Sequence, residues 1–275
     1  MIPKIIHYVW LGGGREKSQL VRSCMESWKR YAIGYEIVEW NESKINEIDS
    51  QFMRDAIAHK KWAHASDVIR LYALKKYGGI YLDTDLELLD NIDEFLKYDF
   101  VTCYEKWNFK YSLITTAFIG AAVGNSIVSD CLEMYAKLSF IRSDGSLNLE
   151  TNVKRITDYL SAKFGIAPPY RGTKLLRLMN DDGAVIFPYY YFCKKRIFHK
   201  SYAVHHAIGS WLQCELGTRT YKCGKVGIKI FKRRGWCPPK FKPLRENRKY
   251  WGRDDIPLFI IPIGKHFLIS AFVCR

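Results

Sequence analysis

A helix, a pair of glycines and a short strand that ends in two aspartates constrain this 275-residue chain more than any other stretch. Apolar residues recur at helical spacing over residues 62–77, two glycines follow, and a short apolar run leads into Asp83. The first glycine, Gly78, is placed for a left-handed helix cap. On a strand, Asp83 and Asp85 would point to the same side. Two carboxylates on one rigid edge suit Mg²⁺ or Mn²⁺, and such a cation can hold a diphosphate.

The beginning of the chain predicts a layered α/β sheet. Residues 2–11 form a nearly continuous apolar run, which is typical of a strand buried on both faces. A helical pattern over 17–31 and a second strand over 35–40 follow, which gives a β-α-β start. Further helices are expected over 52–59, 125–138 and 150–164, and further strands over 100–104, 117–123 and 184–188.

The positive charge of the chain favours anionic partners and is concentrated near its end. The net charge is +15, and the segment 222–253 holds twelve Lys and Arg against Glu246 alone, with aromatic residues between them. A solvated basic face and an anionic membrane surface are both compatible with this segment. Nucleic acid is not expected, because no binding motif accompanies the charge. We therefore expect a catalytic domain over 1–221 and a basic, aromatic extension over 222–275.

The compartment and the membrane topology are predicted from sequence features that are missing. None of the eight cysteines forms a Cys-x-x-Cys pair, so we expect mostly free thiols in a reducing compartment. The first residues lack the features of a secretion signal, and no run reaches about 18 apolar residues. These observations predict a cytoplasmic protein that reaches a membrane through its surface.

The helix before the two aspartates carries its own acid and base. Asp67 and Arg70 are three residues apart and so share one helix face. Such a pair is usually a surface ion pair. Beside a metal-binding edge, Arg70 could instead neutralise phosphate or anchor Asp67, and Asp67 could bind sugar hydroxyls.

Three separated blocks of this sequence resemble the sugar-binding Asp-x-Asp glycosyltransferases. This family includes the yeast-type initiating α-mannosyltransferases and bacterial capsular-polysaccharide transferases, and the catalytic domains of the large clostridial glucosylating toxins are similar here. The blocks are Ala65-Ser66-Asp67-x-x-Arg70-x-x-x-Leu74-x-x-x-Gly78-Gly79-Ile80-Tyr81-Leu82-Asp83-Thr84-Asp85, the opening Ile2-Pro3-Lys4-Ile5-Ile6-His7-Tyr8-Val9-Trp10-Leu11-Gly12, and His205-His206-Ala207-Ile208-Gly209-Ser210-Trp211.

The resemblance implies a fold, a reaction and its cofactors. The fold is of the GT-A, Rossmann-like type, with a mixed, mostly parallel central sheet, to which this chain adds the basic extension. The reaction is the transfer of a sugar from a nucleotide-sugar, of the UDP-hexose or GDP-mannose type, to a saccharide or lipid-linked acceptor, with retention at the anomeric carbon. A divalent cation, Mn²⁺ or Mg²⁺, would stabilise the leaving diphosphate.

The resemblance also assigns roles to individual residues. Asp85 resembles the direct metal ligand, and Asp83 the residue that bridges ribose, metal-bound water and donor sugar. Histidine from the late block resembles a further ligand, with His206 preferred and His205 as the alternative. The remaining matches are donor-sugar contacts at Asp67 and Arg70, a contact near the nucleotide at Tyr81, a base-stacking aromatic at Trp10, and a closing loop over the diphosphate at Ser210 and Trp211.

Two other classes of protein compete with this interpretation. A haloacid-dehalogenase-type phosphatase also ends a strand in Asp-x-Asp, but its motif requires Thr or Val where this chain has Glu87. A non-catalytic protein that binds anionic polymer or glycan would use the basic segment alone. With the glycosyltransferase interpretation we expect surface polysaccharide synthesis, of the capsular or lipopolysaccharide type, at the inner face of a bacterial cytoplasmic membrane.

Overall fold

The structure, a computed structural model, describes residues 1–106, 112–166, 172–178 and 183–207 together with the backbone of four strands between 215 and 274. The chain divides into two compact units, Met1–Ala207 and Ile208–Arg275. The boundary expected after residue 221 falls inside a strand of the second unit. In the described part of the chain, no helix combines the length and the apolar character needed to cross a bilayer.

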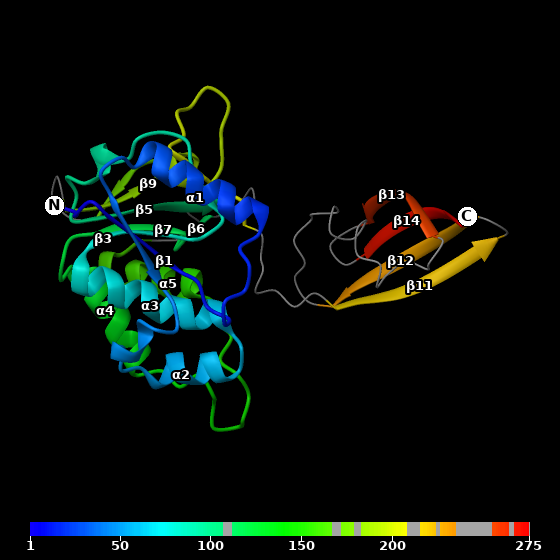
Figure 1. The fold of residues 1–275 in the computed structure, drawn as a ribbon, viewed down its shortest axis with the longest axis horizontal. Helices are drawn as coiled ribbons and strands as arrows, with labels where there is room; N and C mark the ends of the chain where they lie inside the picture. Colours follow the sequence, from blue (N-terminus) through cyan, green and yellow to red (C-terminus); the bar gives the residue numbers. More distant parts are fainter. Residues whose placement is uncertain are drawn as a thin grey trace. The chain divides into compact units, whose positions relative to one another are not determined.

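A mixed sheet of eight strands forms the centre of the first unit (Figure 1). The order is β2-β1-β3-β7-β5-β9-β8, with β6 paired to β5. The pairings give β1, β2, β3, β5 and β9 one direction and β6, β7 and β8 the other, so the predicted mixed, mostly parallel sheet of an α/β fold is confirmed. The strands are β1 (Ile5–Val9), β2 (Glu36–Trp40), β3 (Gly79–Leu82), β5 (Phe100–Lys106), β6 (Ser112–Ile114), β7 (Phe118–Ala121), β8 (Leu176–Arg177) and β9 (Ala184–Phe187).

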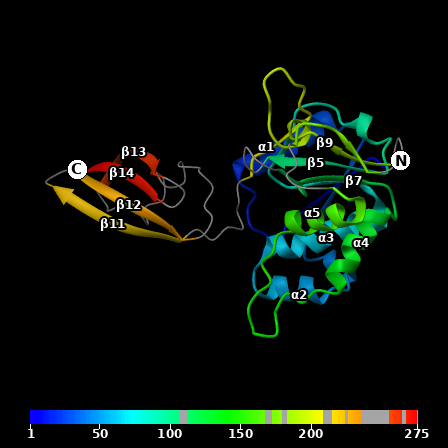
Figure 2. The ribbon, with the colours of Figure 1, turned by 180° about the vertical axis from the view of Figure 1, so that it is seen from behind.

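Helices cover both faces of this sheet. In Figure 1, and from behind in Figure 2, α3, α4 and α5 lie along one face, α2 lies beyond α3, and α1 lies across the other face. The central strands β3, β7 and β9 are consequently buried along their whole length and appear in the sequence as unbroken apolar runs. The helices are α1 (Gln19–Tyr31), α2 (Gln51–Ala58), α3 (Trp62–Tyr77), α4 (Ser126–Ala136), α5 (Asn152–Phe164) and the short α6 (Tyr189–Phe192).

The two glycines after α3 allow the helix to pass directly into the central strand. Gly78 has φ +63° and donates its N–H to the Leu74 carbonyl, which caps the helix. At Gly79, also at positive φ, a Cβ would lie 2.6 Å from the Ile5 carbonyl oxygen. Only glycine therefore lets β3 start so close to β1.

A buried histidine fixes this junction from β1. The Trp40 indole N–H donates to His7 Nδ1 at 3.2 Å, so His7 carries its proton on Nε2 and donates it to the Gly78 carbonyl at 2.9 Å. Burial lowers the pKa of His7 to about 4, so the ring is neutral at pH 7. The neutral ring joins β1, β2 and the end of α3.

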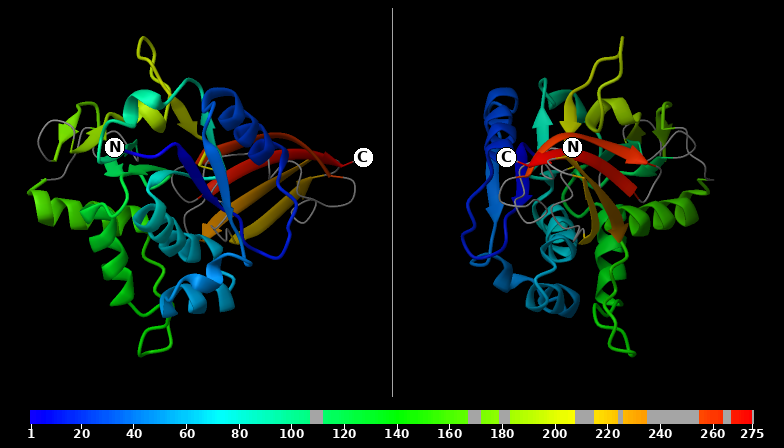
Figure 3. Two further views of the ribbon diagram at one scale, coloured as in Figure 1. Left: turned by 60° about the vertical axis from the view of Figure 1, so that its left-hand side comes forward. Right: turned by 90° about the vertical axis from the view of Figure 1, so that its right-hand side faces the viewer.

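The second unit contains an antiparallel sheet in the order β11-β12-β14-β13. Its strands are β11 (Glu215–Cys223), β12 (Val226–Arg234), β13 (Asp255–Ile263) and β14 (Phe267–Cys274). The short apolar runs near the end of the chain thus lie in β13 and β14. Figure 3 shows both units from two further sides.

Candidate donor-sugar and metal site

The two aspartates of the Asp-x-Asp motif lie in a tight turn. β3 ends at Leu82, and the Leu86 N–H donates to the Asp83 carbonyl at 2.9 Å, which closes a turn before β4 (Leu86–Leu88). The expectation that strand alternation aligns the two carboxylates was therefore wrong in its cause. A turn, not a continuing strand, directs both side chains to the same place.

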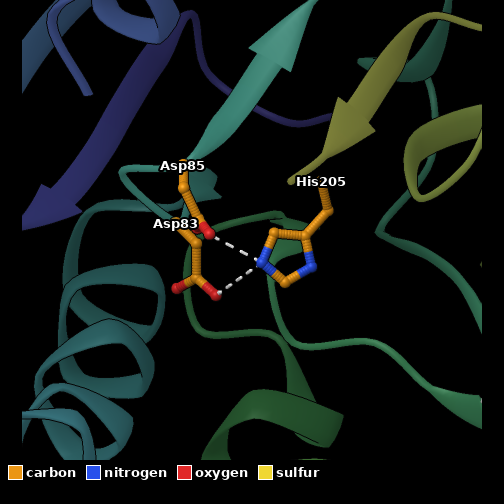
Figure 4. Close-up of side chains that lie close together, drawn as sticks. All are labelled: Asp83, Asp85 and His205. Carbon is orange, nitrogen blue, oxygen red and sulfur yellow. Dashed lines mark ion pairs between the residues drawn. The ribbon is translucent and has the colours of Figure 1, made fainter. Parts of the chain in front are cut away.

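His205 completes this group from the opposite strand. β10 (Ala203–His205) pairs antiparallel with β4, and its register sets His205 against Leu86, next to Asp85. Figure 4 shows His205 Nε2 facing both carboxylates, 3.2 Å from Asp85 Oδ1 and 3.8 Å from Asp83 Oδ2. One ligand atom from each of the three residues lies within 4.8 Å of the others. The sequence interpretation preferred His206, with His205 as the alternative, and the structure brings His205 to the aspartates.

His206 points to a different acid. Its Nε2 lies 3.0 Å from Glu87 Oε2, while its backbone N–H donates to the Asp85 carbonyl at 3.0 Å. Successive residues of an extended chain point to opposite sides, which accounts for the different acids that His205 and His206 face. His206 therefore lies beside the turn with its side chain on Glu87.

Arg70 is buried between two carboxylates. The side chain, 4% exposed, lies with Nη2 3.0 Å from Asp67 Oδ1 and Nη1 3.2 Å from Asp83 Oδ1. Nη1 also donates to the Thr116 carbonyl at 2.7 Å. The usual interpretation of an i,i+3 pair as a surface contact is wrong here, because Arg70 anchors both acids inside the protein.

Tyr81 fixes the orientation of Asp83. Its hydroxyl donates to Asp83 Oδ1 at 3.0 Å, and the Arg70 guanidinium lies 4.4 Å from the centre of its ring. Both Arg70 and Tyr81 hold the same oxygen, so the other oxygen of Asp83 is left to face His205. Tyr81 is itself buried and supports the site through this carboxylate.

Burial and charge shift the protonation equilibria of the site. Burial raises the pKa of Asp67 to about 7, although Arg70 opposes the shift. For His205, burial alone would lower the pKa, but the bonds and charges of Asp85 and Asp83 outweigh it and hold the pKa well above the usual range. Glu105 of β5, which the sequence did not single out, is a further, partly buried acid near His205, and loss of solvent raises its pKa.

A second group of residues lies at the carboxyl ends of β1 and β2. Trp10 lines a cavity of about 280 Å³ together with Gly14, Glu39, Asn41, Glu42 and Ser43. The Trp10 indole N–H donates to the Arg15 carbonyl at 2.9 Å, and the Lys17 ammonium lies 5.1 Å from the ring centre. The aromatic expected to stack on a base is thus half-buried, oriented and beside an open volume.

Glu42 holds the glycine loop next to this cavity. Its Oε1 accepts the backbone N–H groups of Gly12 at 2.7 Å and Gly13 at 2.9 Å, both glycines having positive φ. These bonds lower the pKa of Glu42. Sequence reasoning missed Glu42; its only signal was the run of three glycines, which leaves backbone donors in need of an acceptor.

Some predicted residues cannot be placed in this site. Ser210 and Trp211 lie outside the described residues, as do the side chains of the basic segment 222–253. The described part of the chain therefore supplies Asp67, Arg70, Tyr81 and the two aspartates as one connected group, with Trp10 in a separate group.

Comparison with known proteins relates this region to a described family. Residues 18–101 match the family described as "Glycosyltransferase sugar-binding region containing DXD motif". This region holds α3, β3 and both aspartates. Over this region, the resemblance to the DXD-containing glycosyltransferases that the motifs had implied is confirmed.

Individual relatives match parts of the chain. "Uncharacterized glycosyltransferase L373" of Acanthamoeba polyphaga mimivirus is 25% identical over 169 residues, 58% of this chain and 65% of the relative. "Inositol phosphoceramide mannosyltransferase 3" of Schizosaccharomyces pombe is 30% identical over 103 residues, 35% of this chain and 28% of the relative. The chain thus spans less than two thirds of each. The solved "PaToxG Glycosyltransferase" aligns with a TM-score of 0.49 and 19% identity, over 60% of this chain and 70% of that one.

Proposed function

We propose that this protein is a metal-dependent glycosyltransferase that moves a sugar from a nucleotide-sugar to a saccharide or lipid-linked acceptor. The observation that carries the proposal is the group formed by Asp83, Asp85 and His205, whose ligand atoms lie within 4.8 Å of one another. The group stands at the end of the helix, glycine and strand unit that matches the family.

The donor atoms of this group fit a divalent cation. Two carboxylates and one imidazole suit Mn²⁺, and the carboxylates also suit Mg²⁺. We propose Asp85 and His205 as ligands, with Asp83 as a further ligand or through water. When bound, such a cation would stabilise the negative charge that develops on the leaving diphosphate.

The residues of the chain have separate tasks in this proposal. Arg70 and Tyr81 hold Asp83 in place through one oxygen, so that the other, on the side of His205, is available to the donor or the metal. Asp67 is anchored by Arg70 and accepts or donates a hydrogen bond to a sugar hydroxyl. Trp10 offers a face for the base beside its cavity. Preorganised groups of this kind need little rearrangement when charge develops in the transition state.

The reaction we propose proceeds with retention. The bond between the anomeric carbon and the phosphate oxygen breaks, and its electron pair remains on the diphosphate. The acceptor hydroxyl attacks from the same face, its oxygen forms the new bond, and its proton passes to the departing phosphate oxygen. A dedicated general base is not required on this route.

The acceptor and the cellular location are proposed from the basic segment 222–253 and from the name of one relative. One relative is named for inositol phosphoceramide, which supports a lipid acceptor for this chain as well. We propose UDP-hexose or GDP-mannose as the donor type and surface polysaccharide synthesis as the role. The basic segment 222–253 would keep the enzyme on the inner face of a bacterial cytoplasmic membrane.

Donor hydrolysis gives the most direct test. Nucleotide-sugars are offered one at a time with Mn²⁺, with Mg²⁺ and with excess chelator, and release of nucleoside diphosphate is measured. We expect one donor to be hydrolysed slowly with metal and not with chelator. Release of phosphate from phosphomonoesters would instead indicate a phosphatase, and turnover of neither substrate class would indicate a binding protein.

A further inference from the structure

A short loop between α6 and β10 exposes two bulky apolar side chains at its tip. Among the described residues that are large, apolar and exposed, only Ile197 and Phe198 are neighbours in sequence, with exposed fractions of 78% and 100%. The segment 194–200 projects from the first unit in Figure 1, where it is drawn in yellow. Folding normally hides such a pair, so its exposure requires a reason.

The backbone holds this tip in an unfavourable conformation. The His199 N–H donates to the Arg196 carbonyl at 3.1 Å, which places Ile197 and Phe198 at the two central positions of a turn. Phe198 has φ +63°, a region that favours glycine or asparagine. A phenylalanine kept in this position costs energy in the free protein, and such costs cluster at functional surfaces.

The loop is anchored at its base and not at its tip. The Tyr202 N–H donates to the Tyr191 carbonyl at 2.8 Å, and the His205 N–H donates to the Cys193 carbonyl at 3.0 Å, which closes the stem. Lys200 pairs with Asp90 at 2.9 Å. The segment is therefore a fixed projection whose apolar end is presented to solvent.

Positive charge surrounds the apolar tip. The segment 194–200 carries Lys194, Lys195, Arg196 and Lys200 and no acid, and all four are exposed. Within the described part of the chain, Lys194 and Lys195 form no ion pair. Two side chains are too small an area for a stable protein interface, which needs about 800 Å² per partner. Apolar groups with flanking cations are sufficient for the interface of an anionic bilayer.

We propose that the segment 194–200 docks on an anionic membrane, with Ile197 and Phe198 inserted among the lipids and the flanking cations on the headgroups. The stem ends on His205, which bonds to Cys193, and the four residue steps from Cys193 to Ile197 span at most about 14 Å when extended. The candidate metal site therefore lies near the docked surface. That this position serves a lipid acceptor rests on the proposed function, whereas membrane docking itself does not.

Vesicle binding of the full chain tests the proposal. Sedimentation is measured without donor or metal, using vesicles of phosphatidylcholine alone and of phosphatidylcholine with phosphatidylserine. We expect the wild type to prefer the anionic vesicles, and the double substitution I197S/F198S to lower the partition coefficient about 10-fold or more, because each buried CH₂ contributes. The substitution K194S/K195S is expected to weaken binding by a similar factor, and only to anionic vesicles.

Matched controls separate the loop from the rest of the protein. Ile33 is 74% exposed but is not followed or preceded in sequence by another large exposed apolar residue, so Ile33→Ser should leave vesicle binding unchanged. Donor hydrolysis in solution and thermal unfolding should be unaffected by I197S/F198S, which keeps this test independent of the proposed function. The proposal would be overturned if I197S/F198S bound vesicles as strongly as the wild type, including through the segment 222–253. It would also be overturned if the wild type did not bind vesicles.

Discussion

The two ends of β3 are fixed by networks of opposite character. At its start, His7, Trp40 and the Gly78 carbonyl form uncharged hydrogen bonds in the core. At its end, the buried Arg70 guanidinium lies between Asp67, which is buried, and Asp83, which is partly exposed. Buried charges stabilise a protein less than well-packed apolar groups of similar volume. The charged network is therefore explained by the site it orients, and the neutral one by the junction of helix and strand.

Asp85→Asn should separate catalysis from folding most clearly. The amide keeps the shape of the side chain but removes the charge that would hold the cation, so we expect turnover of the donor to fall by about 100- to 1,000-fold. Thermal unfolding should be unchanged. Asp158→Asn, on an exposed ion pair with Lys154, is the control and should keep full activity. Undiminished turnover by Asp85→Asn would remove the metal site from the mechanism.

Arg70→Met should lower both catalytic activity and folding stability. It leaves the buried Asp67 and the partly exposed Asp83 without their cation, and breaking a buried pair costs about 3 to 5 kcal/mol. Burial raises the pKa of Asp67 to about 7, so this acid can become neutral easily. The loss in free energy of unfolding should therefore lie at the lower end of this range, about 3 kcal/mol. Denaturant unfolding measures it. Arg54→Met, on an exposed pair with Asp49, should change stability by less than about 1 kcal/mol.

The neighbouring histidines offer a matched pair of substitutions. His205→Ala removes the imidazole that faces Asp83 and Asp85, and we expect metal-dependent donor hydrolysis to fall by about 10- to 100-fold. His206→Ala removes the contact with Glu87 and should retain most activity. Titration of activity with Mn²⁺ measures both. The reverse order would mean that the loop rearranges when metal binds and presents His206 instead.

The neutral network should respond to acid. His7 is 1% exposed, and its pKa is lowered from 6.5 to about 4, so its contribution to stability is complete above pH 6.5 and is lost as the pH falls towards 4. Between pH 7 and pH 5 the loss should be about 2 kcal/mol. Urea unfolding of the wild type and of His7→Gln at both pH values isolates the contribution of His7 to the pH dependence of stability, because Gln cannot take up the proton. Equal pH dependence in the two proteins would contradict it.

The sequence predicted the sheet and the motif because their signals are local. Apolar runs identified β1, β3 and β9, and the spacing of Asp67, Arg70 and the aspartates identified one connected group. The choice of His205 over His206 depends on the pairing of β10 with β4, two strands separated by more than a hundred residues. Such a register is fixed by tertiary contacts that a sequence pattern does not contain.

Other features were missed for a similar reason. The strands β4 and β10 are each three residues long and too short for a recognisable alternation. The exposed tip at Ile197 and Phe198 resembles any short apolar pair in sequence, and only its turn and its full exposure distinguish it. The bond from Glu42 to the glycine loop joins two loops across neighbouring strands.

Glu42 extends the comparison to the nucleotide end of the site, where the smallest effect is expected. Its carboxylate is exposed and holds Gly12 and Gly13 beside the Trp10 cavity, so Glu42→Ala should loosen the base platform without touching the metal group. We expect KM for the donor to rise about threefold to tenfold, the equivalent of about 1 kcal/mol, while kcat stays the same. Glu42→Gln keeps an oxygen acceptor and should restore most of the loss. A fall in kcat at unchanged KM would show that this loop affects the reaction at the metal group. The proposal that the Trp10 group only positions the nucleotide would then be wrong.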